Sequence, residues 1–202
     1  MHSFSIGEAL RFGWDKTRAH SGLLFQAMLT LFAVQVASAI VQKVLGGTFL
    51  GLGATLALTV ASVILGAGFM QILLKLAHGH AAHYADIIPR ARVVWHFFCA
   101  SFISGVIVVV GFIALIIPGI YLALRLSMVR FAVLDGAGIT DSLRQSGKET
   151  HGHKWHLLGF FLTLVGLNII GFLALYIGLL ITVPVSGLAW AHVYLKLKGH
   201  TH

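Results

Sequence analysis

The side chains most able to do chemistry in this chain are two arginines that fall in an apolar stretch. Arg125 and Arg130 lie in segment 120–134, which has no acidic residue. A charge at the centre of a membrane-spanning helix costs about 2.5–3.5 kcal/mol unless it is solvated or paired. Arg130 is one turn from the end of the segment, so its guanidinium can extend to water. The partner of Arg125 is then a carbonyl, an amide such as Asn168, an acid reached through a water-filled vestibule, or an anionic ligand.

Two interpretations of these residues stay open. In the first, Arg125, Arg130 and Asn168 contribute to a site for an anion or a lipid headgroup. In the second, Arg125 is a structural arginine bonded to backbone carbonyls.

Two histidine clusters share the spacing H-G-H-x-x-H. Their members are His78, His80 and His83, and His151, His153 and His156. Imidazoles from two loops are suitable ligands for zinc, nickel or copper, and clustered histidines also titrate at about pH 6–7. Neither cluster has a carboxylate or thiolate at fixed spacing. Solvated histidines at a membrane boundary are therefore the simplest interpretation, with a divalent metal and pH sensing as alternatives.

The sequence lacks the motifs of common enzyme classes. It has no G-x-S-x-G, no H-E-x-x-H, no P-loop and no carboxylate pair within an apolar run. A haem would need two opposed ligands among His96, His156 and His192. We predict a protein that is not an enzyme and has no resident cofactor.

The composition indicates that these residues are positioned by membrane helices. The 202 residues are 58% hydrophobic and 10% charged, with a mean hydropathy of +0.92. Soluble domains are about 45–50% apolar and about 25% charged. The 14 lysines and arginines, against 6 acids, punctuate apolar runs rather than form one polar module, which argues against nucleic-acid binding. The single Cys99 excludes an intrachain disulfide.

Charge-free runs predict six transmembrane spans, since a helix needs about 20 residues to cross about 30 Å of hydrocarbon. Pro118-Gly119 predicts the turn between the third and fourth spans, and a tight turn near Tyr176 divides the last run. Ala37-Ser38-Ala39 has the form of a signal cleavage site, but the organised segment before it favours an uncleaved first span. The predicted spans are 21–41, 50–74, 96–117, 120–134, 155–175 and 178–194.

The basic residues orient the spans. Loop lysines and arginines fall on the side of both termini, whereas Lys43 alone falls on the other. The positive-inside rule then places both termini in the cytoplasm of a bacterial inner membrane.

An amphipathic segment recurs before the spans. Ser5 to Glu8 has the pattern of a capping box, which predicts an interfacial helix over 6–18. Segment 139–144 repeats segment 6–11, Thr150 parallels Thr17, and 86–90 is a weaker copy. The fold class predicted is all-α: a polytopic membrane helix bundle of three transmembrane hairpins, each preceded by a cytoplasmic interfacial amphipathic helix.

Several phrases of the sequence carry a family resemblance. They are Ser5-Ile6-Gly7-Glu8-Ala9-Leu10-Arg11-Phe12-Gly13-Trp14, Pro118-Gly119-Ile120-Tyr121-Leu122-Ala123-Leu124-Arg125, Val133-Leu134-Asp135 with Asp141-Ser142-Leu143-Arg144-Gln145-Ser146, and Thr182-Val183-Pro184 with Tyr194. The chain resembles the bacterial multi-pass family related to the glycerophosphoryl diester phosphodiesterase membrane domain. The resemblance implies an integral membrane protein of five or six helices. Phosphodiesterase activity belongs to a separate soluble domain in the fused members of that family.

The leading hypothesis is a membrane protein that binds or organises lipids or other anionic ligands through an intramembrane arginine. A small-solute transporter or channel is the alternative, and a metal-binding protein that uses the histidine clusters is a third. The expected partners are membrane lipids, with a homo-oligomer or a separately encoded protein as further partners, and no nucleic acid.

Overall fold

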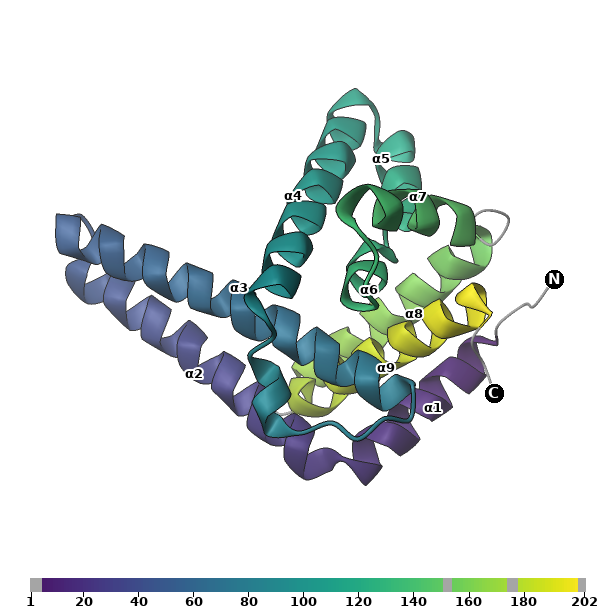
Figure 1. The fold of residues 1–202 in the computed structure, drawn as a ribbon, viewed down its shortest axis with the longest axis horizontal. Helices are drawn as coiled ribbons and strands as arrows, with labels where there is room; N and C mark the ends of the chain where they lie inside the picture. The colour runs from purple at the N-terminus through teal and green to yellow at the C-terminus, as the bar shows by residue number, and fades with distance from the viewer. Residues whose placement is uncertain (1–4, 151–153, 174–177, 200–202) are drawn as a thin grey trace.

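The structure is a computed structural model that describes residues 5–150, 154–173 and 178–199. The described residues form helices and turns, with no β-strand among them (Figure 1), which confirms the predicted all-α class. The elements are α1 (Ile6–Ala19), α2 (Ser21–Leu45), α3 (Phe49–Ala77), the 3-10 helix η1 (Tyr84–Ile87), α4 (Ala91–Ala114), α5 (Ile116–Arg125), α6 (Val129–Leu134), α7 (Ile139–Glu149), α8 (Lys154–Leu173) and α9 (Leu179–Lys198).

Five of these helices, α2, α3, α4, α8 and α9, are long and apolar enough to cross a membrane. They coincide with five of the six predicted spans and indicate a multi-pass membrane protein. Their surfaces carry large exposed apolar side chains such as Phe32 on α2, Phe102 on α4 and Ile170 on α8. Such surfaces suit contact with lipid and would be unfavourable in water.

The segment predicted as the fourth span is not one helix. It consists of the end of α5, a turn over 126–128, and α6. The predicted turn at Pro118-Gly119 is also wrong, because the chain reverses at Leu115, which is extended (φ −168°, ψ 153°). Pro118 then falls in the first turn of α5, where N–H groups have no helical partner and proline is tolerated.

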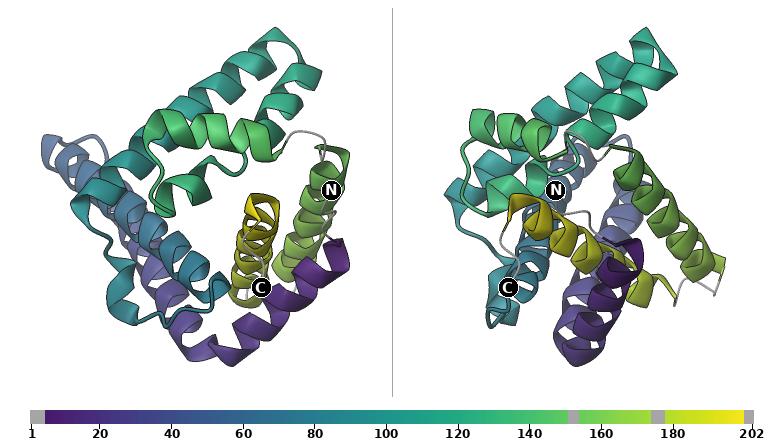
Figure 2. Two further views of the ribbon diagram at one scale, coloured as in Figure 1. Left: turned by 45° about the vertical axis from the view of Figure 1, so that its right-hand side comes forward. Right: turned by 90° about the vertical axis from the view of Figure 1, so that its right-hand side faces the viewer.

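Helix α9 is the central element of the fold. Half of its most apolar window is buried, compared with 11% for α2. It packs against α1, α3 and α8, and it contributes the fully buried Leu188, Val193 and Tyr194. The α2–α3 pair and the α4–α5 pair diverge from one another (Figure 1), and both views in Figure 2 show the α4–α5 pair extending away from α1.

The predicted helix 6–18 is present as α1, and it lies along α9. Its buried residues are small and recur every four positions: Ala9, Gly13 and Thr17. A Cβ atom added to Gly13 would lie 2.5 Å from the Val185 carbonyl oxygen, so the two backbones are in close contact. Small residues allow this approach, which is how helices pack in lipid.

The predicted capping box of α1 is not formed. The side chain of Ser5 makes no cap hydrogen bond. The Glu8 carboxylate instead accepts a hydrogen bond from Lys196 Nζ at 2.5 Å and lies 3.7 Å from His192 Nε2. The hydrogen bond from Lys196 lowers the pKa of Glu8 below its ordinary value. A charge-assisted bond to another helix thus takes the place of a local cap.

The break between α5 and α6 is bridged by α7. The Ser146 hydroxyl donates to the Arg125 carbonyl at 2.7 Å and accepts from the Met128 N–H at 3.2 Å. These are the backbone groups that lose their partners where one helix ends and the next begins. Because Ser146 and Met128 are fully buried, water cannot replace this hydroxyl.

We expect Gly13→Ala to lower the free energy of unfolding by about 1–3 kcal/mol, because the methyl group would be forced against the Val185 carbonyl. The control is Gly53→Ala on α3, where a Cβ meets nothing within 4 Å. It should leave stability unchanged or raise it by about 0.5–1 kcal/mol through helix propensity. Denaturant titration in detergent micelles measures both, and equal effects would contradict close packing of α1 on α9.

We expect Ser146→Ala to destabilise the protein by about 1–3 kcal/mol, because the buried Met128 N–H loses its acceptor and the Arg125 carbonyl keeps only the longer contact from Thr150 Oγ1, at 3.4 Å. The matched control is Ser62→Ala, since the Ser62 hydroxyl only donates to Leu58 O of its own helix. The same denaturant titration compares the two variants, and an effect no larger than that of the control would show that the break does not need this hydroxyl.

Candidate functional site

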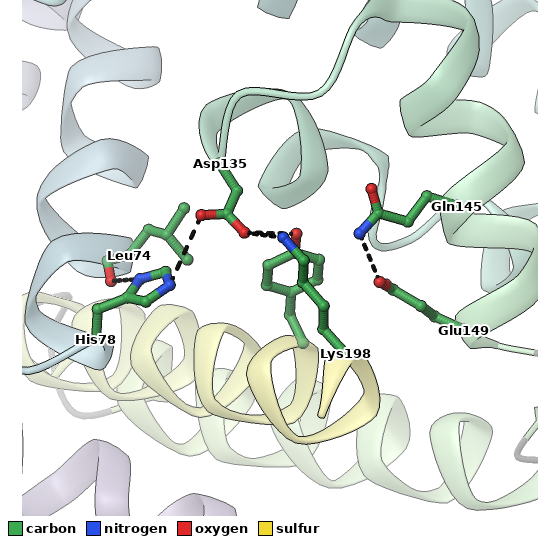
Figure 3. A network of polar contacts seen from close by, with 7 residues as sticks. Leu74, His78, Asp135, Gln145, Glu149 and Lys198 are labelled. Atoms are coloured by element: carbon green, nitrogen blue, oxygen red, sulfur yellow. Dashed lines mark hydrogen bonds and ion pairs between the residues drawn. The ribbon is translucent and has the colours of Figure 1, made fainter. Parts of the chain in front are cut away.

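Three helix ends meet at a polar cluster around Asp135, the residue that ends α6. Its Oδ2 accepts a hydrogen bond from Tyr194 OH at 3.0 Å and another from Lys198 Nζ. Its Oδ1 lies 3.6 Å from Nε2 of His78, the residue that ends α3 (Figure 3). The side chains of Asp135, His78 and Lys198 are only 18–25% exposed. One carboxylate therefore links the ends of α3, α6 and α9.

The tautomer of His78 follows from its second contact. Its Nδ1 lies 3.0 Å from the Leu74 carbonyl oxygen, which only accepts, so Nδ1 carries a proton. A second proton on Nε2 would face Asp135 and turn the contact into an ion pair. The His80 ring stacks on His78 with centroids 5.7 Å apart.

The three cluster residues share a position relative to a helix-ending glycine: His78 and Asp135 are the C-caps of α3 and α6, and Lys198 is the last residue of α9. Each is followed by a glycine in the left-handed region, which ends a helix. These glycines are Gly79 (φ +78°), Gly136 (φ +99°) and Gly199 (φ +82°). Because the three helices end together, the residues one and two turns earlier also lie at matching levels.

One turn before the cluster lies an apolar layer. Leu74, Phe131 and Tyr194 each stand four residues before a cluster member, and all three are buried in the same core. The rings of Phe131 and Tyr194 stack with centroids 5.8 Å apart. This layer separates the polar cluster from the space on its other side.

A cavity of about 360 Å³ lies one turn further on. Met70, Ser127 and Trp190, each four residues before the apolar layer, line it together with Arg130 and part of α4. The Ser127 hydroxyl donates to Leu124 O at 2.8 Å, and Ser104 of α4 donates to Ser101 O at 3.0 Å. Both hydroxyl protons are thus engaged, and the Arg130 guanidinium is the charged donor among the residues that line the cavity, beside Trp190 with its indole N–H.

A second space adjoins Arg130, between α3 and α4. It measures about 410 Å³ and shares Met70 and Arg130 with the first. Its other walls are largely aromatic and aliphatic: Val63, Gly66, Phe97, Phe98, Ser101 and Phe102. Arg130 is an exposed cation where two apolar cavities meet. Mainly apolar pockets of about 300–1,000 Å³ with few polar groups are typical of ligand sites.

The structure places the three predicted anion-site residues in different surroundings. Of the three, Arg130 lines the cavity. Arg125 ends α5 and lies against α7, where a Cβ atom on Gly147 would be 3.0 Å from Arg125 Nε. Asn168 Nδ2 donates to Leu164 O at 2.8 Å and to Ser186 Oγ at 2.9 Å, which ties α8 to α9.

Of the histidines predicted as metal ligands, His78 belongs to the Asp135 cluster, whereas His83 contacts a different acid. The His83 N–H donates to Asp86 Oδ2 at 2.9 Å, and Lys75 Nζ donates to Asp86 Oδ1 at 2.7 Å. The bond from His83 and that from Lys75 lower the pKa of Asp86. Within the described ranges, no three His, Cys, Asp or Glu side chains are grouped closely enough to hold a metal ion.

The convergence of the two histidine clusters stays a prediction, because His151 and His153 lie outside the described residues, as does the predicted turn near Tyr176. His156 is exposed on α8. Of the other proposed haem ligands, His96 Nδ1 lies 2.7 Å from Arg92 O, and His192 stacks on Phe12 with centroids 4.3 Å apart.

Known proteins do not identify this site. No family model, curated protein or solved structure matches the chain. The family resemblance carried by its motifs therefore stays a prediction, and the chemistry of the site rests on its own residues.

The Asp135 cluster was not among the sites predicted from the sequence. A usable signal was present: a polar residue directly before glycine at the end of an apolar run, at His78-Gly79, Asp135-Gly136 and Lys198-Gly199. That pattern is typical of helix C-termini. The pattern predicts that each of these side chains lies at the C-terminal end of its helix, but it does not predict which helices meet.

We expect Asp135→Asn to lower the free energy of unfolding by about 1–3 kcal/mol, because Lys198 would lose its charged acceptor in a site largely shielded from water. Asp15→Asn, at an exposed position on α1, is the control and should change stability by less than about 0.5 kcal/mol. Thermal unfolding in detergent provides the comparison. Equal stability of the two variants would mean that the cluster does not hold the helix ends together.

Proposed function

We propose that this protein binds an anionic amphiphile in the membrane, with the phosphate or carboxylate of the ligand on Arg130 and its hydrocarbon in the adjoining cavities. The observation that carries the proposal is the position of Arg130, one guanidinium between two largely apolar spaces. A planar guanidinium binds phosphate or carboxylate through paired hydrogen bonds. Apolar walls favour hydrocarbon over water.

A phospholipid is the ligand that best fits this combination. It supplies both an anionic group and acyl chains, and five apolar helices would place the cavity beside it in the bilayer. The uneven distribution of lysine and arginine supports an inner-membrane location with both termini in the cytoplasm. On that orientation the Asp135 cluster lies at the cytoplasmic end of the helices.

We further propose that the chain comprises three related units, each a short entry helix followed by a transmembrane hairpin. The repeat aligns Ala9, Gly13 and Thr17 of α1 with Ser142, Ser146 and Thr150 of α7, and all six are buried. The three units are α1 with the α2–α3 hairpin, η1 with α4 and α5–α6, and α7 with the α8–α9 hairpin. Each entry helix packs against the second helix of another unit: η1 on α3, α7 on α6, and α1 on α9. The matching positions of His78, Asp135 and Lys198 support the same division.

A second candidate function is movement of the same amphiphile across the bilayer. The helix break over 126–128 supports it, because broken helices line the sites of many transporters. Dithionite quenching of a fluorescent phosphatidylglycerol in proteoliposomes would detect such movement. A rate equal to that of empty vesicles would exclude it.

We expect Arg130→Gln to weaken binding of phosphatidylglycerol at least about tenfold, since a charged hydrogen bond contributes about 1.5–3 kcal/mol. Gly105→Leu should block the same cavity, because Gly105 lines it and a Cβ there meets nothing within 4 Å. Native mass spectrometry from detergent with added lipid measures both effects.

The controls for this experiment are Arg92→Gln and Gly53→Leu. Both residues are exposed, and Gly53 has open space beside it. Both variants should bind as wild type does. Unchanged lipid affinity in Arg130→Gln and Gly105→Leu would overturn the proposed function.

A further inference from the structure

The cavity beside Arg130 has a second side-chain donor, which the proposed function does not use. Trp190 of α9 lines this cavity, and an indole N–H only donates. The hydroxyl protons of Ser127 and Ser104 are already bonded to carbonyls of their own segments. Among the described residues that line the cavity, Trp190 is therefore the neutral side chain with a proton to offer a ligand.

The indole N–H of Trp190 has no partner and is accessible. It makes no hydrogen bond with the residues that the structure describes, and it is not one of the buried polar atoms that lack a partner. Its neighbours in sequence, Ala189 and Ala191, are fully buried. Gly187, about one turn earlier, is partly exposed and lines the same cavity. The accessible surface of the Trp190 ring thus lies on the cavity side of α9.

Packing holds the Trp190 ring in place. Phe160 of α8 meets it edge-on, with ring centroids 5.1 Å apart and an interplanar angle of 75°. The ring also packs against the core that contains Phe131 and Tyr194. A donor on a fixed ring loses little freedom on binding, so it favours a ligand whose acceptor lies at the matching position.

The levels of the lining residues give the order in which a ligand meets them. Arg130 directly precedes the α6 member of the apolar layer, and Trp190 lies one turn before the α9 member. At about 1.5 Å per residue, Trp190 is then about 4–5 Å further than Arg130 from the Asp135 cluster. The walls beyond both residues are apolar and include Gly187, Ala123 and Val108. The order is a cation, a neutral donor and then hydrocarbon walls.

That order matches a glycerophospholipid with ester-linked chains. The phosphate of such a lipid comes first, the ester carbonyls follow on the glycerol, and the acyl chains lie beyond. A carbonyl oxygen is a good acceptor for an indole N–H. An ether-linked lipid has the same phosphate and the same chains, but it has no carbonyl at this place.

We propose that Trp190 is a specificity-determining residue of the Arg130 site, and that its indole N–H donates to an ester carbonyl of a diacyl glycerophospholipid whose phosphate binds Arg130. This inference rests on the proposed function. It goes further by naming the linkage between headgroup and chains that the site selects. The ligand is then an ester-linked phospholipid rather than any anionic amphiphile.

Native mass spectrometry of the full chain with an equimolar pair of lipids tests this contact. The pair is dioleoyl phosphatidylglycerol and its ether-linked dioleyl analogue, which share a headgroup and chain length and differ in mass. Wild type should bind the ester lipid about three- to tenfold more tightly than the ether lipid, as expected for one neutral hydrogen bond. Equal binding of the two lipids by wild type would overturn the proposal.

Trp190→Phe removes the N–H and keeps an aromatic ring against Phe160. It should bring the ester-to-ether ratio close to one, while the ether lipid binds as it does to wild type. The control is Trp155→Phe, because Trp155 is 85% exposed on α8 and lines neither cavity beside Arg130. The control should keep the wild-type ratio. A wild-type ratio in Trp190→Phe would show that the indole N–H does not select the ligand.

Arg130→Gln separates this inference from the proposed function. That variant should weaken both lipids alike, because they share the phosphate that Arg130 binds. If it does so while wild type binds ester and ether lipids equally, the assignment of Trp190 is wrong and the proposed function stands. If Arg130→Gln binds both lipids as wild type does, the proposed function fails and this inference fails with it.

Discussion

The arrangement of the inner helices depends on the contacts made by the Asp135 carboxylate. It accepts hydrogen bonds from Tyr194 and Lys198 of α9 and faces His78 of α3 (Figure 3). One acid therefore sets the ends of three helices at a common level. The layers beyond it, first the rings of Phe131 and Tyr194 and then the cavity, follow at intervals of one helical turn. In a medium with little water, such a contact is specific because its groups have few alternative partners.

The outer elements are held by different means. Close contact of small residues fixes α1 on α9 and is reinforced by the bond between Glu8 and Lys196. The Ser146 hydroxyl bonds to both backbone groups at the break between α5 and α6, and Thr150 Oγ1 adds a longer contact to the Arg125 carbonyl. The break in turn allows Ser127 and Arg130 to line the cavity. Local hydrogen-bond satisfaction on α7 thus determines where the candidate cationic contact lies.

Features set by local pattern could be predicted from the sequence, and features set by contacts between distant segments could not. Charge-free length located five apolar helices, and amphipathic spacing located α1 within a residue of its end. The fourth predicted span, 120–134, was not found as one helix, because the hydroxyl that stabilises the break comes from Ser146, about twenty positions later in the chain. The capping-box pattern was misleading for a similar reason, since Lys196 binds Glu8 from the other end of the sequence. Arg130 was named as a candidate, but its place between two cavities follows from how α3, α4 and α6 pack.

Photo-crosslinking with a phosphatidylglycerol that carries a diazirine in one acyl chain is the decisive measurement for lipid binding at Arg130, because it reports where the lipid lies on the folded protein in a bilayer. If the lipid binds at Arg130, adducts concentrate on the residues of α4 and α6 that surround this side chain, and far fewer form with a diacylglycerol probe of the same chain length. An even spread of adducts over the exposed apolar surfaces, the same for both probes, would contradict it.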